Sequence, residues 1–280
     1  GHKDDAGHFM EYRDEIAANL DKYAWDGKWF LRGYLDSGKK LGGQESDQCR
    51  IFINSQTWAV VSGAASADKG MQAMDSLKEY LATEHGIVKN YPAYREPDLE
   101  VGAITSFPPG LKENAGIFCH ANTWAVIAEC MLGRGDRAFE YYLSFLPAAK
   151  NDIAEIYTME PYVYSQFITG RVHPYKFGRA RNSWLTGTAS WSFVAVSQYI
   201  LGVRASYDGL VVDPCIPHDW EGFRVRRVFR GKVFDIEVRN PDRVSKGVAS
   251  LTVNGKKLDG TLIPLDVMQD ENRVEVVLGR

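Results

Sequence analysis

The sequence has little of what several large protein classes require. Its 33 lysines and arginines stand against 36 aspartates and glutamates, and no basic stripe forms, so a nucleic-acid partner is not expected. No apolar run approaches the ~20 residues that span a bilayer, and the first fifteen residues lack the apolar stretch of a signal peptide. We therefore expect no membrane segment and a cytoplasmic location.

Cysteine is also scarce in this chain of 280 residues. The four thiols, Cys49, Cys119, Cys130 and Cys215, lie far apart, and no CxxC spacing occurs. A zinc site and a disulfide framework both require closer or paired cysteines, so neither is indicated. We predict that all four are buried thiols without a reactive role.

Motifs of several common enzyme classes are missing as well. The glycine-containing segments 133–136 (GRGD) and 185–190 (LTGTAS) lack the spacing of a P-loop or of a dinucleotide-binding turn, and neither follows a predicted strand. No GxSxG elbow, HExxH helix or EF-hand loop occurs, which argues against a serine hydrolase, a zinc protease and a calcium sensor. Carbohydrate chemistry remains as a class.

Aromatic residues are plentiful, with 7 Trp, 14 Tyr and 13 Phe. Sugar rings present apolar C–H faces that stack on such side chains, which makes a saccharide site one use for them. The alternative is that they fill a large core, where aromatic side chains dominate the buried area in any case.

The first half of the chain alternates two kinds of helical pattern. Apolar residues at helical spacing predict a helix over 9–23, and short alternating runs around glycines predict a hairpin over 25–43. Segment 51–65 is small and apolar on nearly every face, whereas 70–86 has one polar side. We interpret the former as a buried helix and the latter as a helix that covers it.

The same pairing recurs further along the chain. Segment 117–132 is almost wholly apolar, and 138–147 carries the next amphipathic stretch. A third pair is predicted from Glu160, with 160–170 as an inner segment and 183–202 as a long buried helix. Alternating inner and outer helices are typical of an α/α toroid.

A different pattern begins after Val203, where five runs alternate with period two and are separated by Gly and Asn-Gly turns. The sequence therefore predicts a mainly α fold, with part of an (α/α)6 toroid barrel over residues 1–204 followed by a small β-sandwich over 205–280. Between the predicted helices, segment 90–114 contains four prolines and is too long for an ordinary connection, which favours a functional loop.

Candidate site residues lie around that loop and at a later helix start. Glu113 ends the loop, and His120 opens the apolar segment that follows, so both could face one cavity. The alternative for His120 is a satisfied core histidine. Thr186, Gly187 and Thr188 offer hydroxyl groups and an unobstructed backbone, which together with His120 suit a phosphate anion.

Six blocks of the sequence, in order, resemble the inverting glycoside phosphorylases of cellobiose and chitobiose type. They are YAWDGKWFLRGYLDSG, INSQTWAVVSG, SFPPGLKENAGIFCHANTWAVIAE, GRGDRAFEYY, EPYVYSQF and NSWLTGTASW. The resemblance runs nearly from end to end of the chain. The family's (α/α)6 barrel with a C-terminal β-domain agrees with the fold that the residue patterns predict.

The resemblance implies reversible phosphorolysis of a β-linked disaccharide, with inversion, to an α-sugar 1-phosphate and a free sugar. It implies no metal or organic cofactor, because inorganic phosphate is the co-substrate. By resemblance, His120, Thr186 and Gly187 bind phosphate, while Glu113 and Gln166 contact sugar. A homodimer is likewise suggested only by the family.

One part of the family pattern is missing. The general acid of the family is the Asp of a WND-type motif, which lies before the WDGKWF block and occurs nowhere in this chain. By resemblance that Asp, an N-terminal β-domain and further phosphate-binding arginines precede Gly1. Asp26 of WDGKW is interpreted as a structural acid rather than as the missing one.

Three functions stay open at this level. The favoured one is the C-terminal part of an active phosphorylase, without turnover as this segment alone. A non-catalytic carbohydrate-binding remnant and an α/α-barrel glycoside hydrolase are the alternatives. The sugar is glucose or N-acetylglucosamine, with a preference for the chitobiose type that rests on the block from Ser106 to Val126.

Overall fold

The computed structural model describes residues 2–279, and these divide into two compact units. The first unit runs to residue 128 and continues over 141–189. The second comprises 129–140 and the chain from 190 onward. Each is described by itself. The predicted boundary between residues 204 and 205 stays a prediction, because this division follows packing rather than chain order.

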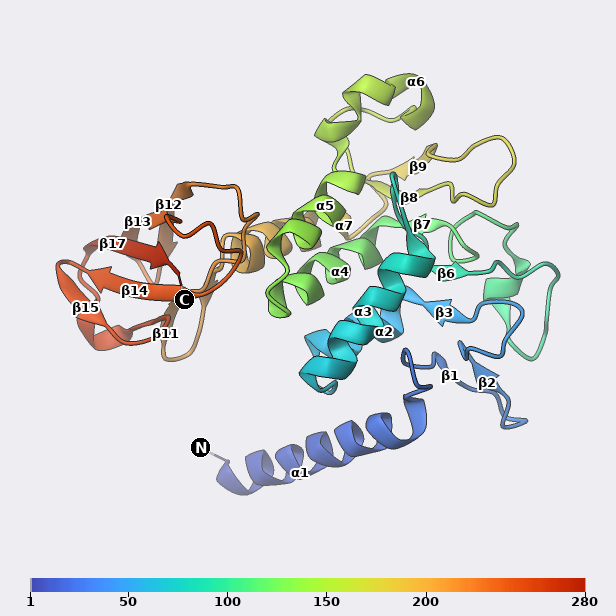
Figure 1. The fold of residues 1–280 in the computed structure, drawn as a ribbon, viewed down its shortest axis with the longest axis horizontal. Coiled ribbons are helices and arrows are strands. Elements are labelled where there is room, and N and C mark those ends of the chain that lie inside the picture. Colours follow the sequence, from blue (N-terminus) through green and yellow to red (C-terminus); the bar gives the residue numbers. More distant parts are fainter. Residues whose placement is uncertain (1, 280) are drawn as a thin grey trace. The chain divides into compact units, whose positions relative to one another are not determined.

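The first unit opens with helix α1 (Figure 1). None of its residues is buried. Helix α1 spans Lys3–Asn19 and continues as a π-helical turn over Leu20–Ala24, which confirms the helix predicted over 9–23. Its apolar residues at helical spacing are all exposed: Phe9, Tyr12, Ile16, Leu20 and Tyr23. Strands β1 (Gly33–Tyr34) and β2 (Lys40–Leu41) then form the predicted hairpin.

Two helices that pack against each other follow this hairpin in the chain. After the short strand β3 (Ile51–Phe52), helix α2 spans Ile53–Val61 and α3 spans Ala67–Leu81. The Oγ atom of Ser66 accepts a hydrogen bond from the Lys69 N–H and so caps α3. The buried residues of α3 repeat at helical spacing: Gly70, Ala73, Met74, Leu77 and Leu81. The predicted pair of an apolar and an amphipathic helix is confirmed.

The proline-rich loop is held by buried asparagines. It follows strands β4 (Ala82–Thr83) and β5 (Gly86–Ile87), begins with β6 (Asn90–Tyr91) and contains a 3-10 turn over Ala103–Ser106. The Asn114 side chain donates to the carbonyl oxygens of Tyr94 and Phe107 and accepts from the Tyr94 N–H. The loop therefore has a defined path although it has little regular structure.

A three-stranded antiparallel sheet follows the loop. It joins β7 (Ile117–Phe118), β8 (Ser165–Ile168) and β9 (Ala180–Ser183), with β8 in the middle. The expectation that 160–170 is an inner helical segment is wrong, because Ser165–Ile168 pairs with strands on both sides. A short apolar run does not by itself distinguish a buried strand from a buried helix, and the strand pairing decided the outcome here.

Helices in the predicted segments 117–132, 138–147 and 183–202 are confirmed with shifted ends, whereas the short helix α6 was not predicted. Helix α4 spans Cys119–Met131, α5 Gly135–Phe145, α6 Ala154–Tyr157 and α7 Thr188–Val194, with a 3-10 segment over Pro147–Ile153 and a π-helical one over Ala195–Ile200. The helix predicted from Ser183 begins five residues later. Trp184 has a positive φ of 68°, which no right-handed helix accommodates, and it is exposed.

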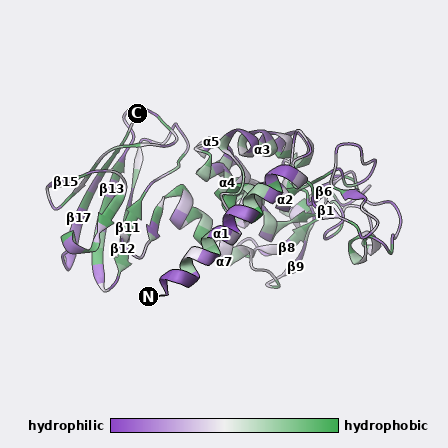
Figure 2. Ribbon diagram, turned by 90° about the horizontal axis from the view of Figure 1, so that it is seen from below, coloured by the Kyte–Doolittle hydropathy of each residue, from purple (hydrophilic) through white to green (hydrophobic). Residues whose placement is uncertain are grey.

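The second unit holds two sheets, in which all strand pairs are antiparallel except the parallel pair β13–β17. One has the order β12-β13-β17-β14-β15 and the other β10-β11-β16. In chain order the strands are β10 (Val203–Ala205), β11 (Gly209–Val212), β12 (Gly222–Phe229), β13 (Lys232–Arg239), β14 (Val248–Val253), β15 (Lys256–Leu258), β16 (Leu262–Pro264) and β17 (Glu271–Leu278). A 3-10 turn over Leu265–Val267 lies between the last two. Buried and less buried residues alternate along β13 and β17, as the period-two pattern predicted. Figure 2 shows both hydrophobic and hydrophilic residues on the strands of this unit.

Three features of the described chain bear on the earlier exclusions. All four cysteines are free and buried, as predicted, and burial raises the pKa of Cys49 and of Cys119 to about 12. Within residues 2–279, no group of three or more His, Cys, Asp or Glu side chains is placed to hold a metal ion. No helix in the same range is both long and apolar enough to cross a bilayer.

Candidate functional site

The sheet β7-β8-β9 brings three distant parts of the chain together at one end of its strands. Antiparallel pairing sets Phe118 opposite Phe167 and Ser165 opposite Ser183, so the end of β7, the start of β8 and the end of β9 lie together. His120 follows β7 directly, Gln166 lies on β8, and the Thr186-Gly187 turn follows β9. The strand directions therefore explain why these predicted site residues gather.

His120 and Gly187 are in direct contact. A Cβ atom placed on Gly187 would lie 2.9 Å from Cε1 and 3.2 Å from Nδ1 of the His120 imidazole, which is closer than such contacts normally allow. The φ of Gly187 is not in the left-handed region, so the requirement for glycine is one of space. The backbone of the turn thus lies close to the ring, nearest to its Cε1 atom.

Thr186 shapes the start of helix α7. Its Oγ1 accepts a hydrogen bond from the Thr188 N–H at 3.1 Å and lies 2.5 Å from the Thr188 hydroxyl oxygen. The Thr188 side chain is fully buried, which fixes this pair of hydroxyl groups. Thr186 itself is partly buried.

Gln166 ties the middle strand to this turn. Its Nε2 donates to the carbonyl oxygen of Leu185 at 3.1 Å, and its Oε1 accepts from Nδ2 of Asn182 at 3.0 Å. Both ends of the amide are therefore engaged by the segment that leads to Thr186. The structure gives Gln166 a positioning role in addition to any contact with a ligand.

The electrostatic setting of His120 favours the neutral imidazole. Burial, and after it the ammonium of Lys89, lower the pKa of His120 below its ordinary value. The ring lies 4.9 Å from the Trp124 ring, measured between centroids, one helical turn further along α4. A neutral imidazole in this position carries one N–H donor and one acceptor.

Glu113 lies beyond the opposite end of β7 from His120. Asn90, which is fully buried, donates from Nδ2 to the Glu113 carbonyl oxygen at 2.8 Å and accepts from the Ala115 N–H at 2.7 Å. Burial lowers the pKa of Lys89, and the Glu113 carboxylate opposes this shift, so the two side chains are within electrostatic range of each other. Sequence reasoning missed Lys89, which carries no motif and lies between two short strands.

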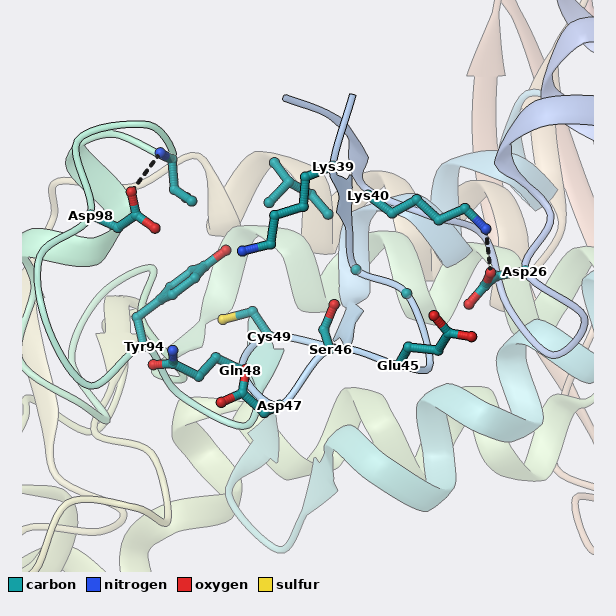
Figure 3. A pocket seen from close by; sticks show the side chains of 14 residues that line it. Asp26, Lys39, Lys40, Glu45, Ser46, Asp47, Gln48, Cys49, Tyr94 and Asp98 are labelled. Carbon is teal, nitrogen blue, oxygen red and sulfur yellow. Dashed lines mark hydrogen bonds and ion pairs between the residues drawn. The ribbon is translucent and has the colours of Figure 1, made fainter. Parts of the chain in front are cut away.

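A separate cavity of about 410 Å³ lies beside the β1–β2 hairpin (Figure 3). Its lining includes Asp26, Lys40, Cys49 and Tyr94 but none of the five predicted site residues. The Asp26 carboxylate accepts from the Gln44 N–H at 2.7 Å and pairs with Lys40 at 3.2 Å. These bonds hold the hairpin, in agreement with the structural interpretation of Asp26.

Two family models match successive parts of the chain. Residues 1–202 match the family described as the glycosyl hydrolase 94 superfamily, catalytic domain, and residues 203–258 match the glycosyl hydrolase family 65, C-terminal domain. The chain is 46% identical to an N,N'-diacetylchitobiose phosphorylase of Vibrio proteolyticus and 44% identical to one of Vibrio furnissii, over 95% and 99% of its length. It is 35% identical to a solabiose phosphorylase of Paenibacillus borealis, over 93% of its length.

These alignments cover only 34%, 35% and 34% of the three relatives, so the chain spans about a third of their length. The catalytic-domain match nevertheless accounts for most of the 280 residues. The chain therefore belongs to the glycosyl hydrolase 94 superfamily.

Proposed function

We propose that this chain is the C-terminal part of a disaccharide phosphorylase that acts with inversion on a β-linked substrate. The products would be an α-sugar 1-phosphate and a free sugar, and inorganic phosphate would be the only co-substrate. The observation that carries the proposal is the contact of the His120 imidazole with Gly187, beside the Thr186 hydroxyl. Similarity to phosphorylases over nearly the whole chain supports it.

In this proposal phosphate lies where the imidazole, the hydroxyl and the turn backbone meet. The neutral His120 ring donates one hydrogen bond, while the Thr186 hydroxyl and the Gly187 amide donate others. A phosphate oxygen held there takes the place of the water and the base of an inverting hydrolase as the attacking group. Fixed donors that orient the nucleophile lower the entropic part of the barrier.

The sugar is proposed to contact Glu113 and Gln166. A carboxylate on a loop fixed by buried asparagines suits hydrogen bonds from sugar hydroxyl groups, since it accepts without moving. Gln166 would contact the sugar only through the hydrogen-bonding capacity that Leu185 and Asn182 leave unused. Chitobiose is the proposed disaccharide, on the strength of the 46% and 44% identical relatives.

The general acid is proposed to come from polypeptide that precedes Gly1 in a longer chain. The relatives are about three times as long as the segment that they share with this chain. The exposed apolar residues of α1, among them Phe9 and Ile16, support this proposal, because a longer chain would cover them. We also propose that the complete chain forms the (α/α)6 barrel with a C-terminal β-sandwich, and that the enzyme is a cytoplasmic homodimer.

The decisive experiment uses the full-length protein with chitobiose and with cellobiose. Release of a sugar 1-phosphate that depends on added inorganic phosphate supports the proposal. Release of free sugar alone would identify a hydrolase, and binding without turnover would identify a carbohydrate-binding remnant. The His120→Ala variant should raise the phosphate KM at least tenfold, whereas His8→Ala, on the exposed helix α1, should leave it unchanged.

A further inference from the structure

Lys89 is fixed by its backbone between two segments of the candidate site. Its N–H donates to the Gly116 carbonyl oxygen at 2.7 Å, just before β7, and its carbonyl oxygen accepts from the Ile53 N–H at 3.0 Å, where α2 begins. The neighbouring Asn90 holds the Glu113 and Ala115 backbone. The position of the Lys89 Cα atom relative to β7 is therefore set by hydrogen bonds on both sides.

The Lys89 ammonium lies over an aromatic ring of β7. The Nζ atom lies 5.5 Å from the centroid of the Phe118 ring, and Phe118 is the last residue of the strand. The side chain is partly buried, yet within residues 2–279 its ammonium makes no hydrogen bond and no ion pair. A partly desolvated ammonium without a counter-ion is unfavourable, and an anionic ligand would relieve that cost.

The charges around Lys89 leave the site net positive. Burial, as the largest cause, lowers the pKa of Lys89, while the Glu113 carboxylate raises it and the Arg32 guanidinium lowers it. Lys89 in turn acts on His120. Within range of the Lys89 ammonium there are thus one further cation, Arg32, and one carboxylate, Glu113, while burial favours the neutral form of the His120 imidazole.

A neutral imidazole, a hydroxyl and an amide can orient phosphate but bring no charge to it. Phosphate at neutral pH carries between one and two negative charges, so a fixed cation strengthens its binding considerably. Lys89 is partly buried, its Nζ lies over the ring of Phe118, two residues before His120, and it forms no ion pair within residues 2–279. Buried Lys150 differs, because its Nζ donates to the Glu84 carbonyl oxygen.

We propose that Lys89 is a further phosphate-binding residue of the site formed by His120, Thr186 and Gly187, and that its ammonium pairs with a phosphate oxygen. This inference rests on the proposed function, since it assigns another contact to the same anion. The Glu113 carboxylate is within electrostatic range of Lys89 but forms no ion pair with it within residues 2–279.

The test measures binding of inorganic phosphate to the full-length protein by calorimetry, so that it does not depend on turnover. Lys89→Met should weaken phosphate binding about tenfold to a hundredfold, the range for hydrogen bonds to charged groups. Lys89→Arg should restore most of the affinity. The matched control is Lys150→Met, which removes another buried ammonium and should leave phosphate binding unchanged.

Unchanged phosphate affinity in a folded Lys89→Met protein overturns the inference. If Lys89→Met does not fold, phosphate affinity is measured for Lys89→Gln instead, because glutamine keeps a polar end group without the charge. Failure of the proposed function is distinguishable: a wild-type protein that binds phosphate through Lys89 but releases no sugar 1-phosphate refutes phosphorolysis and supports this contact. A wild-type protein that does not bind phosphate refutes both.

Discussion

The backbone of Gly187 leaves no room for a side chain beside the ring of His120, because the nearest ring atom would be 2.9 Å from an added Cβ. The two residues come from α4 and from the turn before α7, and the sheet β7-β8-β9 brings them together. Geometry at this contact therefore controls where the imidazole points.

The first prediction concerns Gly187→Ala in the full-length enzyme. The added methyl group must displace the imidazole or the turn, so the phosphate KM should rise about tenfold or more while the protein stays folded. The measurement is initial rate against phosphate concentration at saturating disaccharide. Gly33→Ala is the control, since a Cβ on Gly33 has open space around it. An unchanged phosphate KM for Gly187→Ala would show that this contact does not shape the site.

The second prediction concerns Gln166→Leu. This change keeps the side-chain size but removes the hydrogen bonds to Leu185 and from Asn182. Because both bonds are largely exposed, the loss of stability should be small, about 1 kcal/mol. The effect on phosphate affinity should be larger, because the segment before Thr186 loses its attachment to β8. Calorimetry measures the phosphate affinity of the variant, and urea denaturation measures its free energy of unfolding. A loss of stability without a loss of phosphate affinity would argue against a positioning role for Gln166.

The third prediction concerns Asn90→Ala. Asn90 is fully buried and bonds the backbone of Glu113 and of Ala115. Its removal leaves a buried carbonyl and a buried amide without their partners, and we expect a loss of about 2–4 kcal/mol in the free energy of unfolding. Urea denaturation measures this loss. Asn254→Ala, on an exposed turn between β14 and β15, is the comparison and should cost less.

The fourth prediction concerns pH and His85. Burial, followed by the Lys150 ammonium, lowers the pKa of His85, and the Glu84 carboxylate opposes this only in part. Since the unfolded chain binds a proton near pH 6.5 and the folded chain does not, stability should fall as the pH drops below ~6.5 toward the folded pKa. His120 contributes in the same direction.

Thermal unfolding between pH 7.5 and pH 5 measures this dependence. The His85→Phe variant keeps a ring against Phe177, which lies 4.7 Å away between ring centroids, but cannot bind a proton. Its melting temperature should therefore depend less steeply on pH than that of the wild type. Identical slopes for the two proteins would contradict the prediction.

The sequence alone was enough for features that arise from local patterns. Period-two alternation identified the strands after Val203, because successive side chains of a strand point to opposite faces of the sheet and only one of these faces is buried. Helical spacing identified α1 and α3 in the same way. The wide spacing of the four cysteines, without any CxxC pair, correctly indicated buried thiols.

Only the tertiary structure decided how the candidate site is assembled. Whether Ser165–Ile168 is a strand depended on partners in β7 and β9, which its own residues do not specify. The sequence suggested His120 and Gly187 separately, but their contact requires the register of three strands. Lys89 carries no local signal at all, because a buried charge becomes informative only when its surroundings are known, and those surroundings come from residues distant in the chain.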